Sequence, residues 1–199
     1  MLAVTFKIAG DKQFKVPPLA PLKVPKVSIE PNNNLKITVT DLVISGIETA
    51  KLEDVVFDFD KKIIKVKLLM DHLNVLANYE IDGRLLVQLR GSGPMNITTK
   101  NSHIEYLVNF NTVNKNGKDY MTVDKDKVTL FSEFLHYQLD NLFGNKELSD
   151  QTNKILNENF REVGNELSGP VTETIRSIVT NLIKNYLTKI PMDEIFLKE

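Results

Sequence analysis

The spacing of apolar positions near the C-terminus predicts one long helix, from Ser149 to Ile190. Apolar residues recur there in steps of three or four, at Leu156, Phe160, Val163, Leu167, Val171, Ile175, Ile178, Leu182 and Tyr186. This period places them on one face of a helix. At about 1.5 Å per residue the helix is about 60 Å long, longer than a compact domain of this size is wide. An equally long partner is therefore expected to cover the stripe.

Gly169-Pro170 interrupts the helical pattern. Pro170 has no amide hydrogen and its ring clashes with the carbonyl of Glu166, so the helix is expected to kink or to break there. We favour a kink, because the apolar stripe keeps its phase across the proline. Ser149 or Asp150 is expected to cap the start of the helix, and Pro191 to end it.

The region before this helix has the alternation of β-strands. A proline-rich leading segment, residues 10–34, is followed by apolar runs that we interpret as strands: 35–40, 42–47, 52–59, 63–69, 79–81, 85–89, 106–110, 120–123 and 128–137. Asn116-Gly117 supplies the turn of the clearest hairpin, and the stretch Gly91 to Pro94 is expected to be a break, a bulge or a turn. A long sheet around a long helix forms a tube. The chain is therefore predicted to be α+β, one domain over residues 1–199, with an interior that is either filled by side chains or open as an apolar tunnel.

The composition argues against some classes of binding partner. The 199 residues are 42% hydrophobic with a net charge of −1, so the surface is not expected to carry the dense positive charge that binding of nucleic acid or an anionic membrane needs. No apolar run approaches the ~20 residues of a membrane span. The sequence has no cysteine, which excludes disulfides, thiolate metal sites and cysteine nucleophiles.

Candidate catalytic and metal-binding groups are scattered. His72, His103 and His136 lack metal-ligand spacing, and the pairs Asp58/Asp60 and Asp124/Asp126 are interpreted as solvated strand faces. No serine lies in a nucleophile-elbow context. We therefore expect no enzyme, no metal and no cofactor.

A series of short motifs recurs in order along most of the chain. They are Pro18 to Val24, the Gly46 strand, Tyr79 to Gly83 with Leu85-Leu86, Gly91 to Pro94, Leu142 to Asn145, Leu148, Asn153, Asn157 to Phe160 and Ile190 to Phe196. Together they resemble the takeout and haemolymph juvenile-hormone-binding proteins of insects. The resemblance implies a long C-terminal helix wrapped by a strongly curved antiparallel sheet around an internal hydrophobic tunnel. It also implies a secreted carrier of juvenile hormone, other terpenoids or fatty-acid-like molecules.

The front of the chain departs from the family pattern. Members usually begin with a signal peptide and a short helical segment bearing a disulfide-forming cysteine pair, and this sequence has neither. Either the sequence is truncated or this member lacks the disulfide-bearing segment. The resemblance predicts a secreted protein, and the alternative is a cytoplasmic one.

The sequence thus predicts a monomeric carrier that binds one elongated hydrophobic small molecule, without stable membrane insertion and with a receptor unidentified. The expected lining of the tunnel is Ile37, Val39, Phe57, Tyr79, Ile81, Leu85, Phe110, Tyr120, Leu130, Phe134, Tyr137, Leu156, Phe160, Val163, Val171, Ile175 and Leu182. The three tyrosines in this set are the candidate polar contacts, since each offers a hydroxyl on an apolar ring. The alternatives are an intracellular lipid-transfer module of the same superfamily and a filled-core interaction or signalling module without a ligand.

Overall fold

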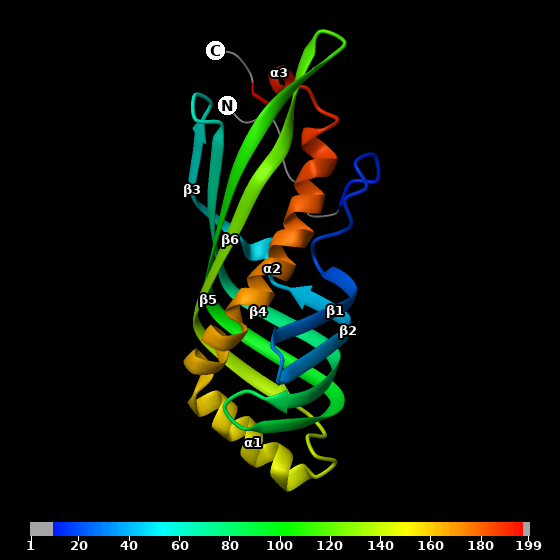
Figure 1. Cartoon of the computed structure of the whole chain (residues 1–199), viewed down its shortest axis with the longest axis vertical. Coiled ribbons are helices and arrows are strands. Elements are labelled where there is room, and N and C mark those ends of the chain that lie inside the picture. The colour runs from blue at the N-terminus through cyan, green and yellow to red at the C-terminus, as the bar shows by residue number, and fades with distance from the viewer. Residues whose placement is uncertain (1–9, 197–199) are drawn as a thin grey trace.

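The computed structural model describes residues 10–196 and shows an elongated molecule, with one long helix beside a curled sheet (Figure 1). The strands are β1 (Leu22–Asn32), β2 (Leu35–Ser45), β3 (Lys51–Asp58), β4 (Ile63–Arg84), β5 (Gln88–Lys115) and β6 (Lys118–Leu139). The helices are the 3-10 turn η1 (Ile47–Thr49), then α1 (Lys146–Glu158), α2 (Phe160–Leu187) and the short α3 (Met192–Ile195). Below, "lower" and "upper" refer to Figure 1, where α1 lies at the lower end.

All strands form one antiparallel sheet in the order β1-β2-β4-β5-β6. The long strand β4 pairs with β2 along its lower part and with β3 along its upper part. The tip of the β5–β6 hairpin is Asn116-Gly117, with φ of 51° and 79°. Two positive φ values are what a two-residue turn between twisted strands requires, so the predicted hairpin is confirmed.

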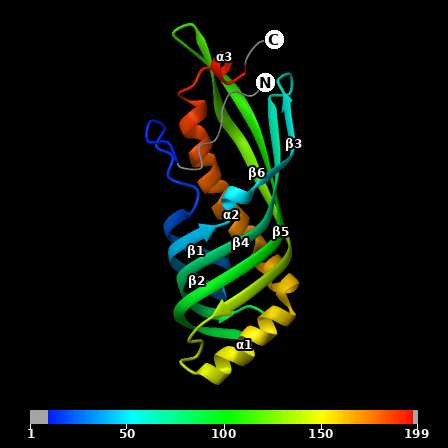
Figure 2. The ribbon, with the colours of Figure 1, turned by 180° about the vertical axis from the view of Figure 1, so that it is seen from behind.

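The sheet curls until its first and last strands both touch the same helix. α2 contacts β6 along its length and also contacts β1, and Figure 2 shows the curl from behind. β1 and β6 are the two ends of the strand order, so α2 closes the gap between them. The predicted fold class, a long C-terminal helix wrapped by a curved antiparallel sheet, is confirmed.

The stretch Gly91 to Pro94 is not a break in the chain, as the sequence suggested, but part of the continuous strand β5. A Cβ atom at Gly91 would lie 2.7 Å from the carbonyl oxygen of Asn141, and one at Gly93 would lie 2.7 Å from that of Asp140. The glycines are needed because another chain segment crosses them, not because the strand turns. That segment ends in Leu142, which is fully buried and closes the lower end of the curl.

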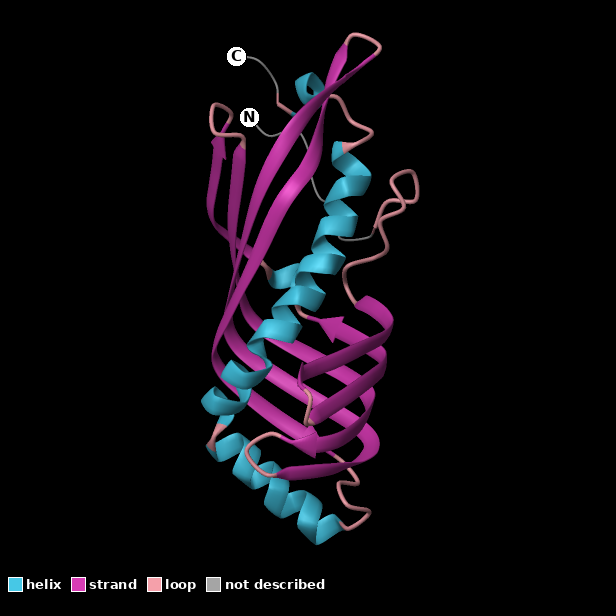
Figure 3. Ribbon diagram, in the orientation of Figure 1, coloured by secondary structure: helices cyan, strands magenta, loops and turns pink. Residues whose placement is uncertain are grey.

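The predicted helix is present as two pieces, and its interruption lies at Asn159 rather than at Pro170 (Figure 3). Asn159 has φ −115° and ψ 31°, and α1 turns away there across the lower end. α2 continues through Pro170, where the hydroxyls of Thr172 and Thr174 donate to the carbonyls of Ser168 and Pro170. No helix in the described part of the chain is both long and apolar enough to cross a membrane.

A candidate ligand-binding interior

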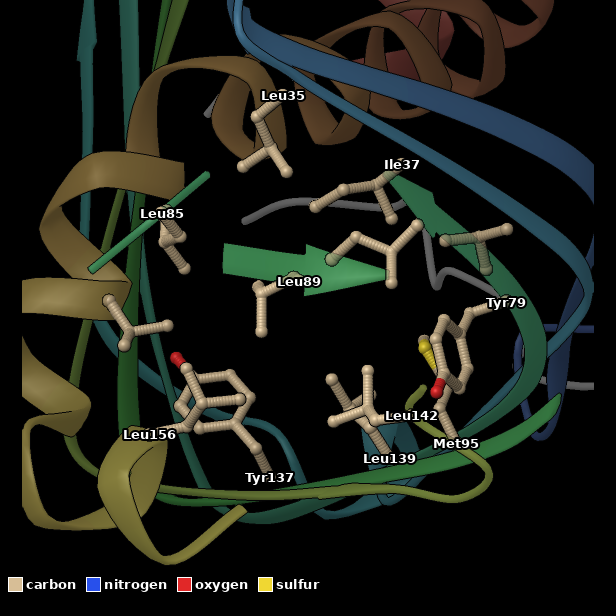
Figure 4. Close-up of a cluster of buried hydrophobic side chains, with 13 residues drawn as sticks. Leu35, Ile37, Tyr79, Leu85, Leu89, Met95, Tyr137, Leu139, Leu142 and Leu156 are labelled. Carbon is tan, nitrogen blue, oxygen red and sulfur yellow. The ribbon is translucent and has the colours of Figure 1, made fainter. Parts of the chain in front are cut away.

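The lower half of the curl holds the largest group of buried apolar side chains, here called the lower core cluster. Figure 4 shows side chains of the sheet and of helix α1 converging on its centre. Its members are Leu35, Ile37, Val39, Tyr79, Ile81, Leu85, Leu89, Met95, Tyr137, Leu139, Leu142, Leu156 and Val163. Strand residues two apart point to the same face, and the alternation of Leu35, Ile37 and Val39 places β2's apolar face inside.

Helix α1 attaches to the exposed edge of β6 through two asparagine side chains. The Asn157 amide accepts from the Tyr137 amide nitrogen at 2.7 Å and donates to the Tyr137 carbonyl at 2.8 Å. Asn153 makes the same pair of bonds with Leu139, both at 2.9 Å. These bonds satisfy strand groups that would otherwise lack partners at a sheet edge. The sequence singled out both asparagines only as motif residues, without a role.

The upper half contains two smaller apolar clusters against α2. One consists of Tyr106, Val108 and Val128 of the sheet. Packed against it from α2 are Ile175, Val179 and Ile183. The other is built on Phe110, Met121, Leu187 and Ile195. Above Pro170 the helix therefore faces the sheet with Val179 and Ile183, one position later than the predicted Ile178 and Leu182. The predicted stripe takes a step of three from Ile175 to Ile178, whereas the contacting positions Ile175, Val179 and Ile183 keep steps of four.

A buried carboxylate fixes α2 to β6 in this upper half. Asp126 has a side chain that is 5% exposed, and it accepts hydrogen bonds from Tyr106 at 2.8 Å, from Arg176 at 2.8 Å, and from Thr180. Burial raises the pKa of Asp126, but these hydrogen bonds outweigh that effect and hold the pKa below its ordinary value. Asp126 is thus a clasp between helix and sheet.

The interpretation of Asp126 as a solvated residue was wrong, and a bulge explains why. The register of β5 with β6 shifts between the pairs Asn109–Lys125 and Phe110–Val123. Asp124 is the extra residue, and it is exposed. An extra residue reverses the inward–outward alternation beyond it, which turns Asp126 inward.

On each of the three long strands, the alternation of inward and outward side chains reverses at the same height. We call this position the face switch. Two consecutive residues are exposed on each strand: Asp71 and His72 on β4, Lys100 and Asn101 on β5, Glu133 and Phe134 on β6. The flanking residues point inward and pair across the sheet, Met70 with Ser102 and Ser132 on one side, Leu73 with Thr99 and Leu135 on the other. Asn101 has φ 48°. The face switch separates the lower core cluster from the upper ones.

Apolar side chains on the inner wall near the face switch keep part of their surface uncovered. Leu68, Leu73, Ile104 and Leu130 on the sheet are all intermediate in burial, and so is Val171 on α2. Their strand partners and alternation place the four sheet residues on the same face as the buried Met70, Tyr106 and Val128. The middle of the interior is therefore lined by apolar side chains that keep part of their surface accessible.

The three tyrosines predicted as polar contacts lie in different surroundings. The Tyr79 hydroxyl donates to the Asp140 carbonyl at 2.7 Å; burial, and then the charge of Asp140, raise the pKa of Tyr79 to about 12. Tyr120 lies near the hairpin tip, with the Lys115 ammonium 5.3 Å from its ring centre. Tyr137 is 6% exposed, burial raises its pKa, and its hydroxyl has no hydrogen-bond partner among residues 10–196. Among the three, Tyr79 uses its hydroxyl in a bond to the protein, and Tyr137 is the one that lies in the lower core cluster without such a bond.

The structure brings most, but not all, of the predicted lining together. Phe160 packs against the lower core cluster. Eight of the predicted residues belong to that cluster: Ile37, Val39, Tyr79, Ile81, Leu85, Tyr137, Leu156 and Val163. Phe110 and Ile175 lie in the upper clusters, and Leu130 lies on the middle of the inner wall. Val171 and Leu182 are partly exposed on α2, and Phe57 contacts Phe196 with ring centres 5.1 Å apart.

Phe134 was expected on the inner wall but lies on the outer face. It is 38% exposed, pairs with Lys100, and has the Lys100 ammonium 5.6 Å from its ring centre. Leu130 and Phe134 have the same parity in sequence, and the face switch between them places them on opposite faces.

Polar groups of the inner wall were missed by the sequence reasoning. Thr99 and Ser102 are 7% and 0% exposed, and Ser132 faces them from β6. A three-residue spacing between two inward side chains does not follow from alternation alone. The left-handed Asn101 between them is the local signal, since asparagine is among the residues that adopt this conformation most readily.

A surface pocket of about 410 Å³ lies at the lower end, lined by Arg90, Gly91, Ser92, Asn141, Phe143 and Gly144. Sites for apolar small molecules are lined mainly by hydrophobic side chains. Phe143 is the one such side chain in this set, so the pocket does not suit a long apolar ligand.

Comparison with known proteins agrees with this arrangement. A solved structure, Takeout 1 of Epiphyas postvittana, superposes with a TM-score of 0.86 at 30% sequence identity, covering 94% of this chain and 88% of that one. The circadian clock-controlled protein daywake of Drosophila melanogaster is 26% identical over 203 residues, covering 96% of this chain and 78% of the relative. Its counterpart in Drosophila yakuba is 25% identical over the same length. Residues 3–197 match the family described as haemolymph juvenile hormone binding protein, and the chain therefore belongs to the takeout and juvenile-hormone-binding family.

Proposed function

We propose that this protein is a carrier that binds one elongated hydrophobic small molecule inside the curled sheet. The observation that carries the proposal is the partly uncovered apolar wall at mid-height, formed by Leu68, Leu73, Ile104 and Leu130 opposite α2. Apolar surface inside a fold costs free energy while it remains uncovered, and a ligand of matching shape removes that cost. Family membership supports the same reading, since the family is described by its binding of a hormone.

Burial supplies enough free energy for such binding. A terpenoid or fatty-acid-like ligand with about 350 Å² of apolar surface gains about 9 kcal/mol at ~25 cal/mol/Å². Lost translational freedom and ligand ordering take back several kcal/mol. The expected affinity is micromolar or somewhat tighter.

The proposed contacts follow the length of the interior. The lower core cluster forms one end, the upper clusters the other, and the Tyr137 hydroxyl offers a hydrogen bond near the lower end. Because sheet and helix share these clusters, we propose that the chain acts as one domain. The family description refers to haemolymph, and we propose by analogy that this carrier acts outside cells. We assign it no catalytic role, in line with the description of the family by its binding of a hormone.

Native mass spectrometry and ligand titration test the carrier proposal. A stoichiometric hydrophobic molecule released from the purified protein, or micromolar binding of methyl farnesoate or palmitate after delipidation, is the expected result. A clean unliganded mass with no melting shift from either compound would contradict it and favour the filled-core module.

A pair of tryptophan variants locates the binding space. Ile104 points inward at mid-height, whereas Thr129 is exposed on the other face. Ile104→Trp is expected to occupy the space, weakening binding at least tenfold with little change in the melting temperature of the free protein. Thr129→Trp should leave binding unchanged. If the interior is already filled, Ile104→Trp instead overpacks it and costs about 1–3 kcal/mol of stability.

A further inference from the structure

Three hydroxyl groups meet on the inner wall at the face switch. The Thr99 Oγ1 lies 2.7 Å from the Ser102 Oγ, which in turn lies 2.8 Å from the Ser132 Oγ. Thr99 and Ser102 are 7% and 0% exposed, so two of the three are removed from bulk water. We call this set the hydroxyl cluster.

The hydroxyl cluster has more hydrogen-bond donors than it uses. Three hydroxyls carry three protons, and two mutual hydrogen bonds consume two of them. Whichever direction the two bonds run, one O–H is left over, and it finds no further acceptor among residues 10–196. Where this O–H belongs to Thr99 or Ser102 it is buried, and a buried donor without a partner costs about 1–3 kcal/mol, which a bound acceptor removes.

The surroundings select the kind of acceptor. The inward neighbours of the cluster across the sheet are Met70, Leu73 and Leu135, all apolar. The nearest cation in sequence, Lys100, is exposed on the opposite face, over Phe134. An ionised carboxylate in such surroundings carries a large desolvation cost, whereas a neutral oxygen does not.

The position of the cluster fixes where on the ligand this oxygen lies. Along β5, Thr99 is four residues from Met95 in the lower core cluster, and Ser102 is eight residues from Phe110 in an upper cluster. At about 3.3 Å per strand residue these are about 13 Å and about 26 Å. Apolar wall therefore extends in both directions from the hydroxyls.

On this basis, and resting on the carrier function proposed above, we infer that the hydroxyl cluster is a recognition site for a neutral oxygen group in the interior of an elongated apolar ligand. An alcohol fits best, because it accepts the spare proton and donates to a free lone pair of the cluster. A ketone, ester or epoxide oxygen accepts only. The carrier thereby prefers oxygenated chains over plain hydrocarbon chains of the same length.

A matched pair of probes tests this inference: methyl stearate and methyl 10-hydroxystearate, titrated into the delipidated full chain. The wild-type protein is expected to bind the hydroxy ester about five- to tenfold more tightly, the effect of one net hydrogen bond. The triple variant Thr99→Val, Ser102→Ala, Ser132→Ala removes every member of the cluster together. It leaves no orphaned partner, so it is expected to fold. Its preference should disappear or reverse.

The control is Thr98→Val, which makes the same change on the opposite face of β5, beside Thr99. It should keep the wild-type preference. Equal binding of both probes by the wild-type protein, or an undiminished preference in the triple variant, would overturn the inference while leaving the carrier function intact. Failure of both probes to bind would overturn the carrier function with it.

Discussion

The side chain of Asn153 and the backbone of Leu139 exchange two hydrogen bonds, one in each direction, at 2.9 Å. Asn157 repeats the arrangement with Tyr137. Four helix residues rise about 6 Å and two strand residues about 6.6 Å, so the two spacings match closely. One face of α1 thus replaces the neighbouring strand that β6 lacks.

Replacing either asparagine should loosen the lower end of the molecule. Asn153→Ala or Asn157→Ala leaves an amide and a carbonyl of β6 without partners, and we expect each variant to lose about 2 kcal/mol in free energy of unfolding. Urea denaturation measures this loss. Asn181→Ala, at an exposed position of α2, is the matched control and should change the free energy of unfolding by no more than about 0.5 kcal/mol. Equal effects at all three positions would contradict the role assigned to α1.

Gly93 should not tolerate a methyl group. Its Cβ would lie 2.7 Å from the Asp140 backbone oxygen, and a backbone atom cannot move aside as a side chain does. Gly93→Ala is expected to destabilise the protein by about 2 kcal/mol or more through overpacking, measured by thermal or urea unfolding. Gly169→Ala has open space around it and should be tolerated. A stable Gly93→Ala protein would show that the crossing segment is not held against β5.

The Asp126 clasp predicts a specific dependence on acid. The pKa of Asp126 in the folded protein is below its ordinary value of 3.8, so its contribution is complete above pH 3.8 and is lost as the pH falls further. At neutral pH, Asp126→Asn should unfold with about 2 kcal/mol less free energy than the wild-type protein. This difference should shrink in urea titrations below pH 3.8. A difference that is constant with pH would contradict the assignment.

The two buried tyrosines of the lower cluster should respond differently to loss of the hydroxyl. Tyr137→Phe removes a hydroxyl without a protein partner, so it should weaken binding of an oxygenated terpenoid such as methyl farnesoate by up to about tenfold while stability is kept. Tyr79→Phe removes the bond to Asp140 and should lower stability with little effect on affinity. Isothermal titration and melting curves on the same samples separate the two. The reverse pattern would assign the polar contact to Tyr79.

Sequence periodicity was sufficient for the architecture. The apolar stripe from Leu156 onward and the Asn116-Gly117 turn record local preferences, and local preferences were enough to predict a long helix beside a hairpin-rich sheet. The resemblance to known motifs added the strong curvature of the sheet. The long helix and the curved sheet were confirmed, because neither depends on residues far apart in the chain meeting with atomic accuracy.

The inner wall could not be predicted in the same way. Its membership depends on alternation, and alternation is reset at the bulge of Asp124 and at the face switch. Either irregularity reverses every inward assignment beyond it, which is why Asp126 was placed in solvent and Phe134 inside. The prediction of a break at Gly91 to Pro94 was wrong for a related reason. A glycine needed for close approach of another segment has the same appearance in sequence as one needed for a turn.

The closing of the sheet by α2 has a further consequence, for self-association. A free strand edge offers unpaired backbone groups to a second molecule, which is the first step toward cross-β aggregates. At the lower end, the β6 edge is occupied by Asn153 and Asn157, and β1 contacts α2 and carries Pro25 and Pro31, which cannot donate to a neighbouring strand. The features that enclose the interior therefore also leave fewer free backbone groups at these two edges of the sheet for another copy of the chain to pair with.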